Sequence, residues 1–234
     1  MKKFLIATVV LLGSITLANA EQYRVGVSVM GAGFEADGAK EIFSGSHAGN
    51  NASSTKVTKD ASSEKENAEG AFVLASVFAE YQATDLLSVG VNFVPMSADT
   101  ETAENVQNIG NLPADPGSGE KTNRVKVSFE DVITVYALAN LSENVYAKVG
   151  YMQLDLITEE NLATGGAYGN DTLDGYTIAL GYNMDLADGM FLRAEASYMD
   201  IDGTTLTNTN DSTKSVSADG LTGYGAAVSV GKSF

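Results

Sequence analysis

The sequence contains no cysteine, no tryptophan, three prolines and a single histidine among 234 residues. Without cysteine, no disulfide can stabilise the fold, and both a thiolate nucleophile and a zinc site built from cysteines are excluded. The one histidine, His47, lies in the polar segment Ser44–Asn50, which we expect to be a mobile loop. A loop of that kind cannot hold a general base in position for catalysis. The sequence therefore predicts no enzyme, no catalytic residue and no cofactor.

Basic residues are also scarce, because 14 Lys and Arg stand against 30 Asp and Glu, for a net charge of −16. Binding of nucleic acid needs a basic face, so nucleic acid is excluded as a partner.

Long apolar runs are absent except at the start of the chain. Lys2 and Lys3 precede the apolar run Phe4–Leu12, and Ala18-Asn19-Ala20 is typical of a cleavage site. The run is too short for a membrane anchor, so residues 1–20 are predicted to be a cleaved signal peptide for Sec-type export. Residues 21–234 then form one domain. No later run approaches the roughly 20 apolar residues of a spanning helix, so any membrane crossing must use strands.

The end of the chain alternates with a period of two. Tyr224, Ala226, Val228, Val230, Lys232 and Phe234 share one face, and the intervening residues are small glycines, alanines and serines. Side chains of a strand point to opposite faces in turn, so this segment is predicted to be a strand with one apolar face and one weakly polar face.

The same alternation occurs in seven earlier segments. The eight predicted strands are Tyr23–Phe34, Gly70–Gln82, Leu87–Phe93, Arg124–Ala139, Val145–Met152, Tyr176–Asn183, Met190–Met199 and Tyr224–Phe234. Short turns alternate with four long polar stretches, which we expect to be loops: Glu35–Glu69, Ser97–Asn123, Asp155–Asp174 and Asp200–Asp219. This regular sorting of connections is typical of a transmembrane barrel.

Two strands are harder to orient. In Gly70–Gln82 both faces are largely apolar, and we place Glu80 and Ser76 inward because a carboxylate in lipid is costly. Asp131 falls among lipid-facing positions of Arg124–Ala139. Either a bulge shifts the register there, or the strand stands above the membrane at that point.

Aromatic residues of the predicted lipid face gather at the strand ends, as expected for rings that favour both membrane interfaces. The two predicted belts consist of Tyr23, Tyr81, Tyr182 and Phe234 at the turn side, and Phe93, Tyr151, Tyr176, Tyr198 and Tyr224 at the loop side.

Three segments carry a family resemblance. The closing strand ends in Phe234, with Tyr224, Val228 and Val230 on its apolar face, and the segments Leu141–Tyr151 and Phe191–Glu195 open strands directly after turns. The chain resembles the small bacterial outer-membrane barrels of the opacity-protein and OmpA/OmpX-like superfamily. Lys232 departs from their pattern at a usually apolar position, and we expect no OmpA-type peptidoglycan-binding domain after the barrel.

The resemblance implies an all-β fold, an eight-stranded antiparallel up-and-down barrel with three short periplasmic turns and four long extracellular loops. It also implies a monomer in the outer membrane of a Gram-negative bacterium. The implied partners are membrane lipid, lipopolysaccharide and the outer-membrane assembly machinery.

Seven charged residues are predicted to face the barrel lumen: Arg24, Glu80, Lys126, Glu130, Lys148, Arg193 and Glu195. Eight strands leave little room for a pore, so we favour a structural ion-pair network over a narrow ion path or gate.

The four long stretches hold 21 of the acids and only 6 of the bases. Divalent cations could bridge such carboxylates to lipopolysaccharide, but no segment has the spacing of a calcium loop, so no metal site is assigned. We expect a structural or surface-interaction role carried by these acidic loops, as in envelope integrity, adhesion or shielding. The alternative is a narrow channel or a conduit for small or hydrophobic solutes.

Overall fold

The computed structural model describes residues 22–36, 39–43, 68–109, 119–163, 166–210, 212 and 214–234. The predicted signal peptide and His47 lie outside these residues. The described strands are β1 (Tyr23–Ala36), β2 (Ala39–Phe43), β3 (Ala68–Gln82), β4 (Leu87–Val94), β5 (Ala98–Asp99), β6 (Ala103–Ile109), β7 (Gly119–Asn140), β8 (Val145–Leu162), β9 (Asp171–Asp185), β10 (Met190–Ile201), β11 (Thr204–Thr207), β12 (Lys214–Ala218) and β13 (Leu221–Ser233).

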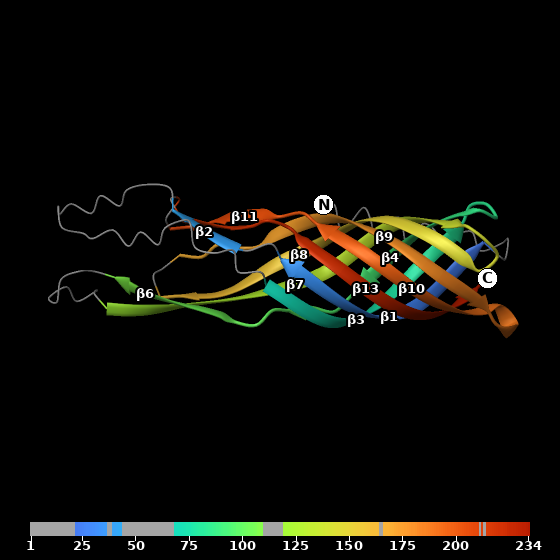
Figure 1. Ribbon diagram of the computed structural model, residues 1–234, viewed down its shortest axis with the longest axis horizontal. Coiled ribbons are helices and arrows are strands. Elements are labelled where there is room, and N and C mark those ends of the chain that lie inside the picture. Colours follow the sequence, from blue (N-terminus) through green and yellow to red (C-terminus); the bar gives the residue numbers. More distant parts are fainter. Residues whose placement is uncertain are drawn as a thin grey trace.

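Eight of these strands close into an antiparallel barrel, which confirms the predicted fold class (Figure 1). The order around the wall is β4, β3, β1, β13, β10, β9, β8 and β7, and β4 pairs with β7 to close the circle. The first and last strands of the barrel meet at this wall, where Phe234 N donates to the Tyr23 carbonyl at 2.8 Å. Among the described residues, no helix is both long and apolar enough to cross a membrane.

One end of the barrel, called here the turn end, carries three tight connections. They follow β3, β7 and β9, and the last contains a single helical turn at Ala187–Gly189. Thr84 Oγ1 accepts hydrogen bonds from the Leu86 and Leu87 amides, and Ser142 Oγ accepts one from Val145. The short connections are therefore fixed locally by side-chain hydroxyls, as is usual for Ser and Thr in turns.

At the opposite end, the loop end, the wall is much taller than predicted. β7, β8 and β9 continue far into the stretches assigned to loops, β5 and β6 pair with β7, and β11, β12 and β2 form a separate three-stranded sheet. The boundaries of the loops are thus corrected within the described residues. Polar composition did not prevent strand formation there, because each neighbouring strand supplies partners for the backbone.

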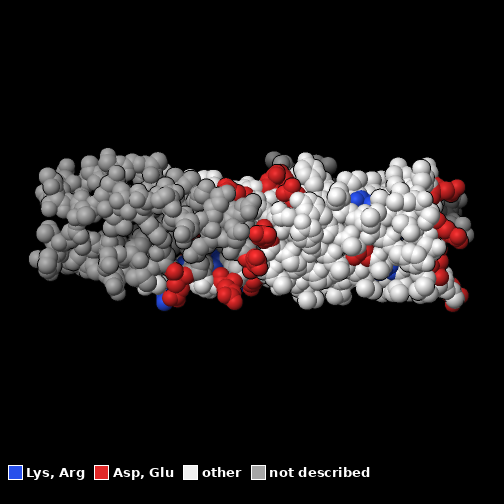
Figure 2. All heavy atoms as spheres, in the orientation of Figure 1, with Lys and Arg blue, Asp and Glu red and all other residues white. Residues whose placement is uncertain are grey.

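The barrel exterior is apolar between the two ends. Val29 and Val73 expose 55% and 72% of their surface, and the other outward valines, leucines and isoleucines are similarly exposed. Figure 2 shows an almost entirely white band over the barrel, with acidic residues at the turn end and again toward the loop end. An exposed apolar band of this kind is suited to lipid rather than water.

A bulge in β7 decides the open question at Asp131. The pairing with β8 shifts between Glu130 and Ile133, and Asp131 adopts a φ of 52°, in the left-handed region that Asp tolerates better than most residues. The extra residue exchanges the two faces of the strand. Thr134 and Tyr136 face the lumen after the bulge, whereas Val127 and Phe129 face it before the bulge.

Candidate functional site

A pair of opposite charges spans the lumen near the turn end. Arg193 of β10 donates to both carboxylate oxygens of Glu80 on β3, from Nη1 at 2.6 Å and from Nη2 at 3.0 Å. The side chains expose 5% and 0% of their surface. Hydrogen bonds to the remaining polar atoms of such a buried bidentate pair offset its desolvation, although Arg193 Nε finds no partner among the described residues. Tyr136 contributes here by donating to Glu80 Oε1 at 2.8 Å.

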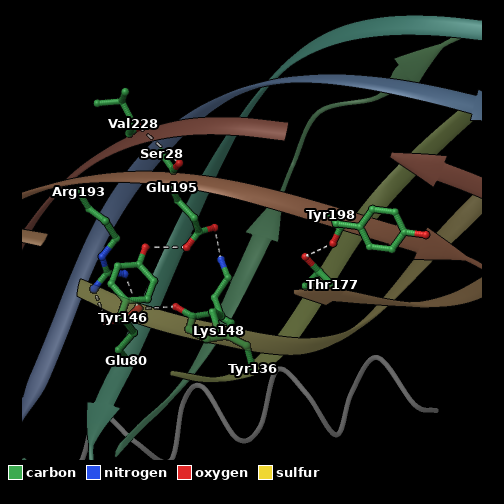
Figure 3. Close-up of polar contacts among 10 residues, drawn as sticks. All are labelled: Ser28, Glu80, Tyr136, Tyr146, Lys148, Thr177, Arg193, Glu195, Tyr198 and Val228. Atoms are coloured by element: carbon green, nitrogen blue, oxygen red, sulfur yellow. Dashed lines mark hydrogen bonds and ion pairs between the residues drawn. The ribbon is translucent and has the colours of Figure 1, made fainter. Parts of the chain in front are cut away.

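A second ion pair lies beside the first. Lys148 of β8 donates to Glu195 Oε1, and Tyr146 donates to Glu195 Oε2 at 2.7 Å (Figure 3). The rings join the two pairs, because the Arg193 guanidinium lies 4.9 Å from the Tyr146 ring centroid and Lys148 Nζ lies 5.2 Å from that of Tyr136. A desolvated cation over an aromatic face contributes about 2 kcal/mol. We call these six residues the polar floor.

Each large ring of this region lies over a glycine on the neighbouring strand. Tyr146 is the cross-strand partner of Gly181, and a Cβ at Gly181 would lie 2.1 Å from the ring. Tyr136 lies in the same way over Gly90, at 2.6 Å. Phe78 and Phe191 also have glycine partners. The absence of a side chain at these glycines gives the rings the space that lets them cross the lumen.

Four of the seven predicted lumen charges, Glu80, Lys148, Arg193 and Glu195, thus belong to the polar floor. Arg24 lies nearby, with its guanidinium carbon 5.8 Å from the centroid of the Phe191 ring. Tyr136 and Tyr146 were not among the residues predicted for the network. The signal that could have found them is an inward tyrosine paired with an inward glycine.

Lys126 and Glu130 correct the prediction, because the bulge turns both to the outside of the wall. Lys126 Nζ contacts Asp99 at 2.9 Å and Glu159 at 3.7 Å, and Arg124 pairs with Glu104 in the same row. The hydrogen bond from Lys126 lowers the pKa of Asp99 below its usual value and raises the pKa of Lys126. These ion pairs stand in water above the apolar band, where each contributes little.

Above the polar floor, the lumen is a cavity of about 1170 Å³, which we call the chamber. Its wall is built by two apolar clusters, whose buried members are Ala32, Met152, Leu154, Leu156, Leu173, Met199, Ile201, Leu74, Val94 and Ala98. Met30, Phe34, Phe72 and Phe129 pack against them. The chamber is therefore apolar on most of its circumference, and its lower boundary includes Lys148, Arg193 and Glu195 of the polar floor.

Polar side chains hold the loop-end rim of the chamber on the β8–β9 side. Glu160 accepts hydrogen bonds from the Tyr168 and Gly169 amides and from the Thr158 hydroxyl. Thr204 of β11 donates to Asp171 of β9. The connection between β8 and β9 is therefore fixed to the wall.

The predicted aromatic belts lie on the outer surface. Tyr23 pairs with Tyr81 near the turn end, with ring centroids 5.2 Å apart. Tyr151–Tyr176 and Tyr198–Tyr224 pair at 5.7 and 5.4 Å toward the loop end. The exposed members are Tyr81, Tyr151, Tyr176, Tyr182, Tyr224 and Phe234. Lys232 Nζ lies 5.4 Å from the Phe234 ring centroid, so the departure from the family pattern is accommodated by a cation over that ring.

Comparisons with solved structures find outer-membrane proteins of low sequence identity. No protein-family model and no curated protein matches the chain. The outer membrane protease OmpT of Escherichia coli matches in structure with 9% identity and a TM-score of 0.44, over 92% of this chain and 98% of that one. The outer membrane protein OprG of Pseudomonas aeruginosa matches with 10% identity and a TM-score of 0.40, over 90% and 96%. Neisserial surface protein A matches with 12% identity and a TM-score of 0.37, over 89% of this chain and 97% of that one.

Proposed function

We propose that the protein is a non-enzymatic integral barrel of the outer membrane that takes small apolar solutes into its chamber from the loop end. The observation that carries the proposal is the chamber itself, with its wall of methionine, leucine and phenylalanine side chains. Ligand sites are concave and mostly apolar, with volumes of about 300–1,000 Å³, and the chamber is of that order. This corresponds to the conduit alternative rather than to the surface role that we favoured from the sequence.

The polar floor supports a solute of this class over an ion. A buried ion pair, a partly buried ion pair and two tyrosines occupy the lumen below the chamber, with Arg193 and Glu80 almost without exposed surface. An ion would have to replace its hydration shell with groups that are already paired, which is costly. An apolar solute can lie above the floor without disturbing it.

A fluorescence experiment tests the proposal, because the chain contains no tryptophan. Leu154→Trp places a reporter in the chamber wall, and Phe191→Trp places a control reporter in the fully buried region beside Arg193. With the protein in lipid vesicles, 1-bromooctane should quench the chamber reporter saturably and the control reporter much less. Equal quenching of both reporters, or quenching that rises linearly with the lipid content, would contradict the proposal.

A structural or surface-interaction role is the second candidate. It is favoured by the tall wall at the loop end, whose outer face carries the paired charges Arg124–Glu104 and Lys126–Asp99. Such a surface could meet lipopolysaccharide or divalent cations outside the membrane. A strain that lacks the protein would then lose envelope integrity. Complementation with the Leu154→Trp variant should restore integrity, whereas complementation with a variant that lacks these four charges should not. That outcome would favour this role over solute uptake.

Orientation in the membrane follows from both candidates. The loop end should face the outside of the cell and the turn end the periplasm, after export and insertion by the assembly machinery. Thr205→Cys on β11 and Ser142→Cys in the turn after β7 are both exposed. A membrane-impermeant maleimide should label only Thr205→Cys on intact cells, and labelling of Ser142→Cys alone would invert the orientation.

A further inference from the structure

Among the described residues, the barrel wall around the chamber includes a place where two neighbouring segments are not joined by strand pairing. β1 pairs with β3 along its whole length, from Tyr81 to Ala68. On its other edge, β3 pairs with β4 only from Val77 to Gln82, because β4 ends at Val94. The upper part of that edge, residues 68–76, has no paired strand among the described residues. We call the junction between residues 68–76 and residues 94–101 the seam.

The far side of the seam is well ordered by a different neighbour. β7 continues past the end of β4 and there pairs with β5, with Thr100 and then with β6. Thr100 donates its amide to the Val127 carbonyl at 2.8 Å and accepts the Val127 amide on its hydroxyl at 3.0 Å. The segment 94–101 is therefore fixed to β7 and not to β3. Figure 1 shows β3 ending midway along the molecule while β6 and β7 continue.

Contacts across the seam are weak or apolar. The Ala75 amide donates to Met96 Sδ at 3.4 Å, and a thioether sulfur is a weak acceptor. Leu74 from β3 packs with Val94 and Ala98 from the other side. On the opposite side of the tall wall, β9 and β11 are joined by Thr204 to Asp171, and Ala167 exchanges hydrogen bonds with Thr209. The seam is thus the weakly joined side.

The seam lies where the loop-side aromatic belt crosses the wall. Val77 is the cross-strand partner of the belt residue Phe93 on β4. Ala71 pairs with Gly33 on β1, which pairs on its other side with the belt residue Tyr224 on β13, so Ala71 lies at the level of Tyr224. Val73, between these levels, exposes 72% of its surface outward. The inner side of the same segment lines the chamber, with Phe72 and Leu74 from β3 and Val94, Ala98 and Thr100 opposite. At the seam, therefore, only the single layer of the barrel wall lies between the chamber and the lipid at the level of the loop-side belt.

We propose that the seam is a side entrance through which a small, uncharged apolar molecule passes between the chamber and the lipid. This rests on the proposed function, because it gives a route for the solute that the chamber binds. Backbone groups without strand partners are tolerated at membrane depth only where they adjoin protein or a cavity, as the edge of β3 does here. Apolar side chains that part in lipid lose little, because lipid chains are as apolar as they are. A charged molecule would gain no such passage.

A reversible staple across the seam tests the route. The chain has no cysteine, so Ala75→Cys with Met96→Cys, added to Leu154→Trp, gives one disulfide at the seam. The matched control is Ala79→Cys with Val91→Cys, which are cross-strand partners where β3 and β4 are paired. Vesicles carrying 1-bromooctane are mixed with vesicles carrying the protein, and the rate of quenching is measured before and after reduction.

The oxidised seam staple should slow quenching about tenfold, as expected when a gate is locked, and reduction should restore the rate. The control staple should change the rate less than twofold, since pairing already closes the wall there. An unchanged rate with the seam staple oxidised would overturn the side entrance and leave the mouth as the route. Absence of quenching in every variant would instead overturn the proposed function.

Two substitutions that need no disulfide act on the same place. Ala98→Phe fills the seam and should slow quenching, and Val94→Ala loosens it and should speed quenching, since both residues pack against Leu74. Shifted mobility of the unheated protein on gels confirms that each variant is folded. Each substitution is combined with Leu154→Trp. If 1-bromooctane quenches both combined variants at the same rate as Leu154→Trp alone, solute does not pass the seam.

Discussion

The lower and upper halves of the lumen share most of their strands but differ in how their inward side chains fill the space. Below, rings that lie over glycines cross the lumen and interleave with two ion pairs, so the space is filled. Above, the inward positions are mostly methionines, leucines, valines and phenylalanines that line the wall and leave a cavity of about 1170 Å³. An eight-stranded barrel is just wide enough for side chains to fill. The comparison shows that residue choice, not strand number, decides whether a given level is closed.

The largest expected effect breaks the lower half. Arg193→Ala removes one partner of a buried pair and leaves Glu80 charged without its bidentate donor. The free energy of unfolding should fall by about 3–5 kcal/mol, measured from the urea midpoint in vesicles. Lys232→Ala, which removes an exposed outward cation, is the control. If Arg193→Ala lowers the free energy of unfolding no more than Lys232→Ala does, water must reach the polar floor and screen the unpaired charge.

A matched pair of leucines compares the two halves directly. Leu138 on β7 is 1% exposed beside the floor, and Leu154 on β8 is 3% exposed in the chamber wall. Truncation of a packed leucine to alanine costs about 2–5 kcal/mol, and the cost grows with the cavity created. Leu154→Ala enlarges a cavity that already exists, so its cost should lie at the lower end of this range and that of Leu138→Ala higher. Equal costs from the same urea titrations would mean that the chamber is packed as densely as the floor.

Gly181→Ala tests the space beneath the rings. The added methyl would displace Tyr146, which donates to Glu195. Overpacking of this kind costs about 1–3 kcal/mol, again read from the urea midpoint. Gly169→Ala is not a useful control because of its positive φ, so Gly31→Ala, with open space around it, serves instead. The account fails here if the two substitutions have the same effect.

The smallest effect concerns the exposed pair of Asp99 and Lys126. Because the pKa of Asp99 is lowered in the folded protein, the ionised carboxylate stabilises the fold above its unfolded pKa. That contribution is lost as the pH falls through the lowered folded pKa. The small stability difference between the wild type and Asp99→Asn at neutral pH should therefore decline as the pH falls below the usual Asp value of 3.8 and vanish once the pH is below the lowered folded pKa. A difference that persists there would assign it to packing instead.

Much of this arrangement was accessible from the alternation of side chains. The period of two placed Glu80, Arg193 and Glu195 inward, although the first two are 113 positions apart in the sequence. Their pairing was not predictable, because it depends on the stagger among strands that are not adjacent in the chain. The same rule failed for Lys126 and Glu130, since one bulged residue reverses every face beyond it. The apolar chamber was missed for this reason as well, with Val127 and Phe129 assigned to lipid.

Composition misled the prediction at the loop end. Stretches rich in Ser, Thr, Asn and acids were expected to be loops, yet β8 and β9 extend through much of Asp155–Asp174. Asn, Asp and Glu are weak strand formers, but a neighbouring strand with free backbone groups can recruit them. The seam could not be seen in the sequence at all, because it depends on where β4 stops relative to β3 and β7.

The most direct test of a lumen divided into a closed floor and an apolar chamber is single-channel conductance in a planar bilayer. The wild type should show no steady ionic current, since Glu80, Arg193, Tyr136 and Tyr146 fill the lumen with paired groups. Replacing both charges, in Glu80→Ala with Arg193→Ala, should open a water path and give measurable current. Steady current through the wild-type protein, unchanged in the double variant, would contradict the closed floor.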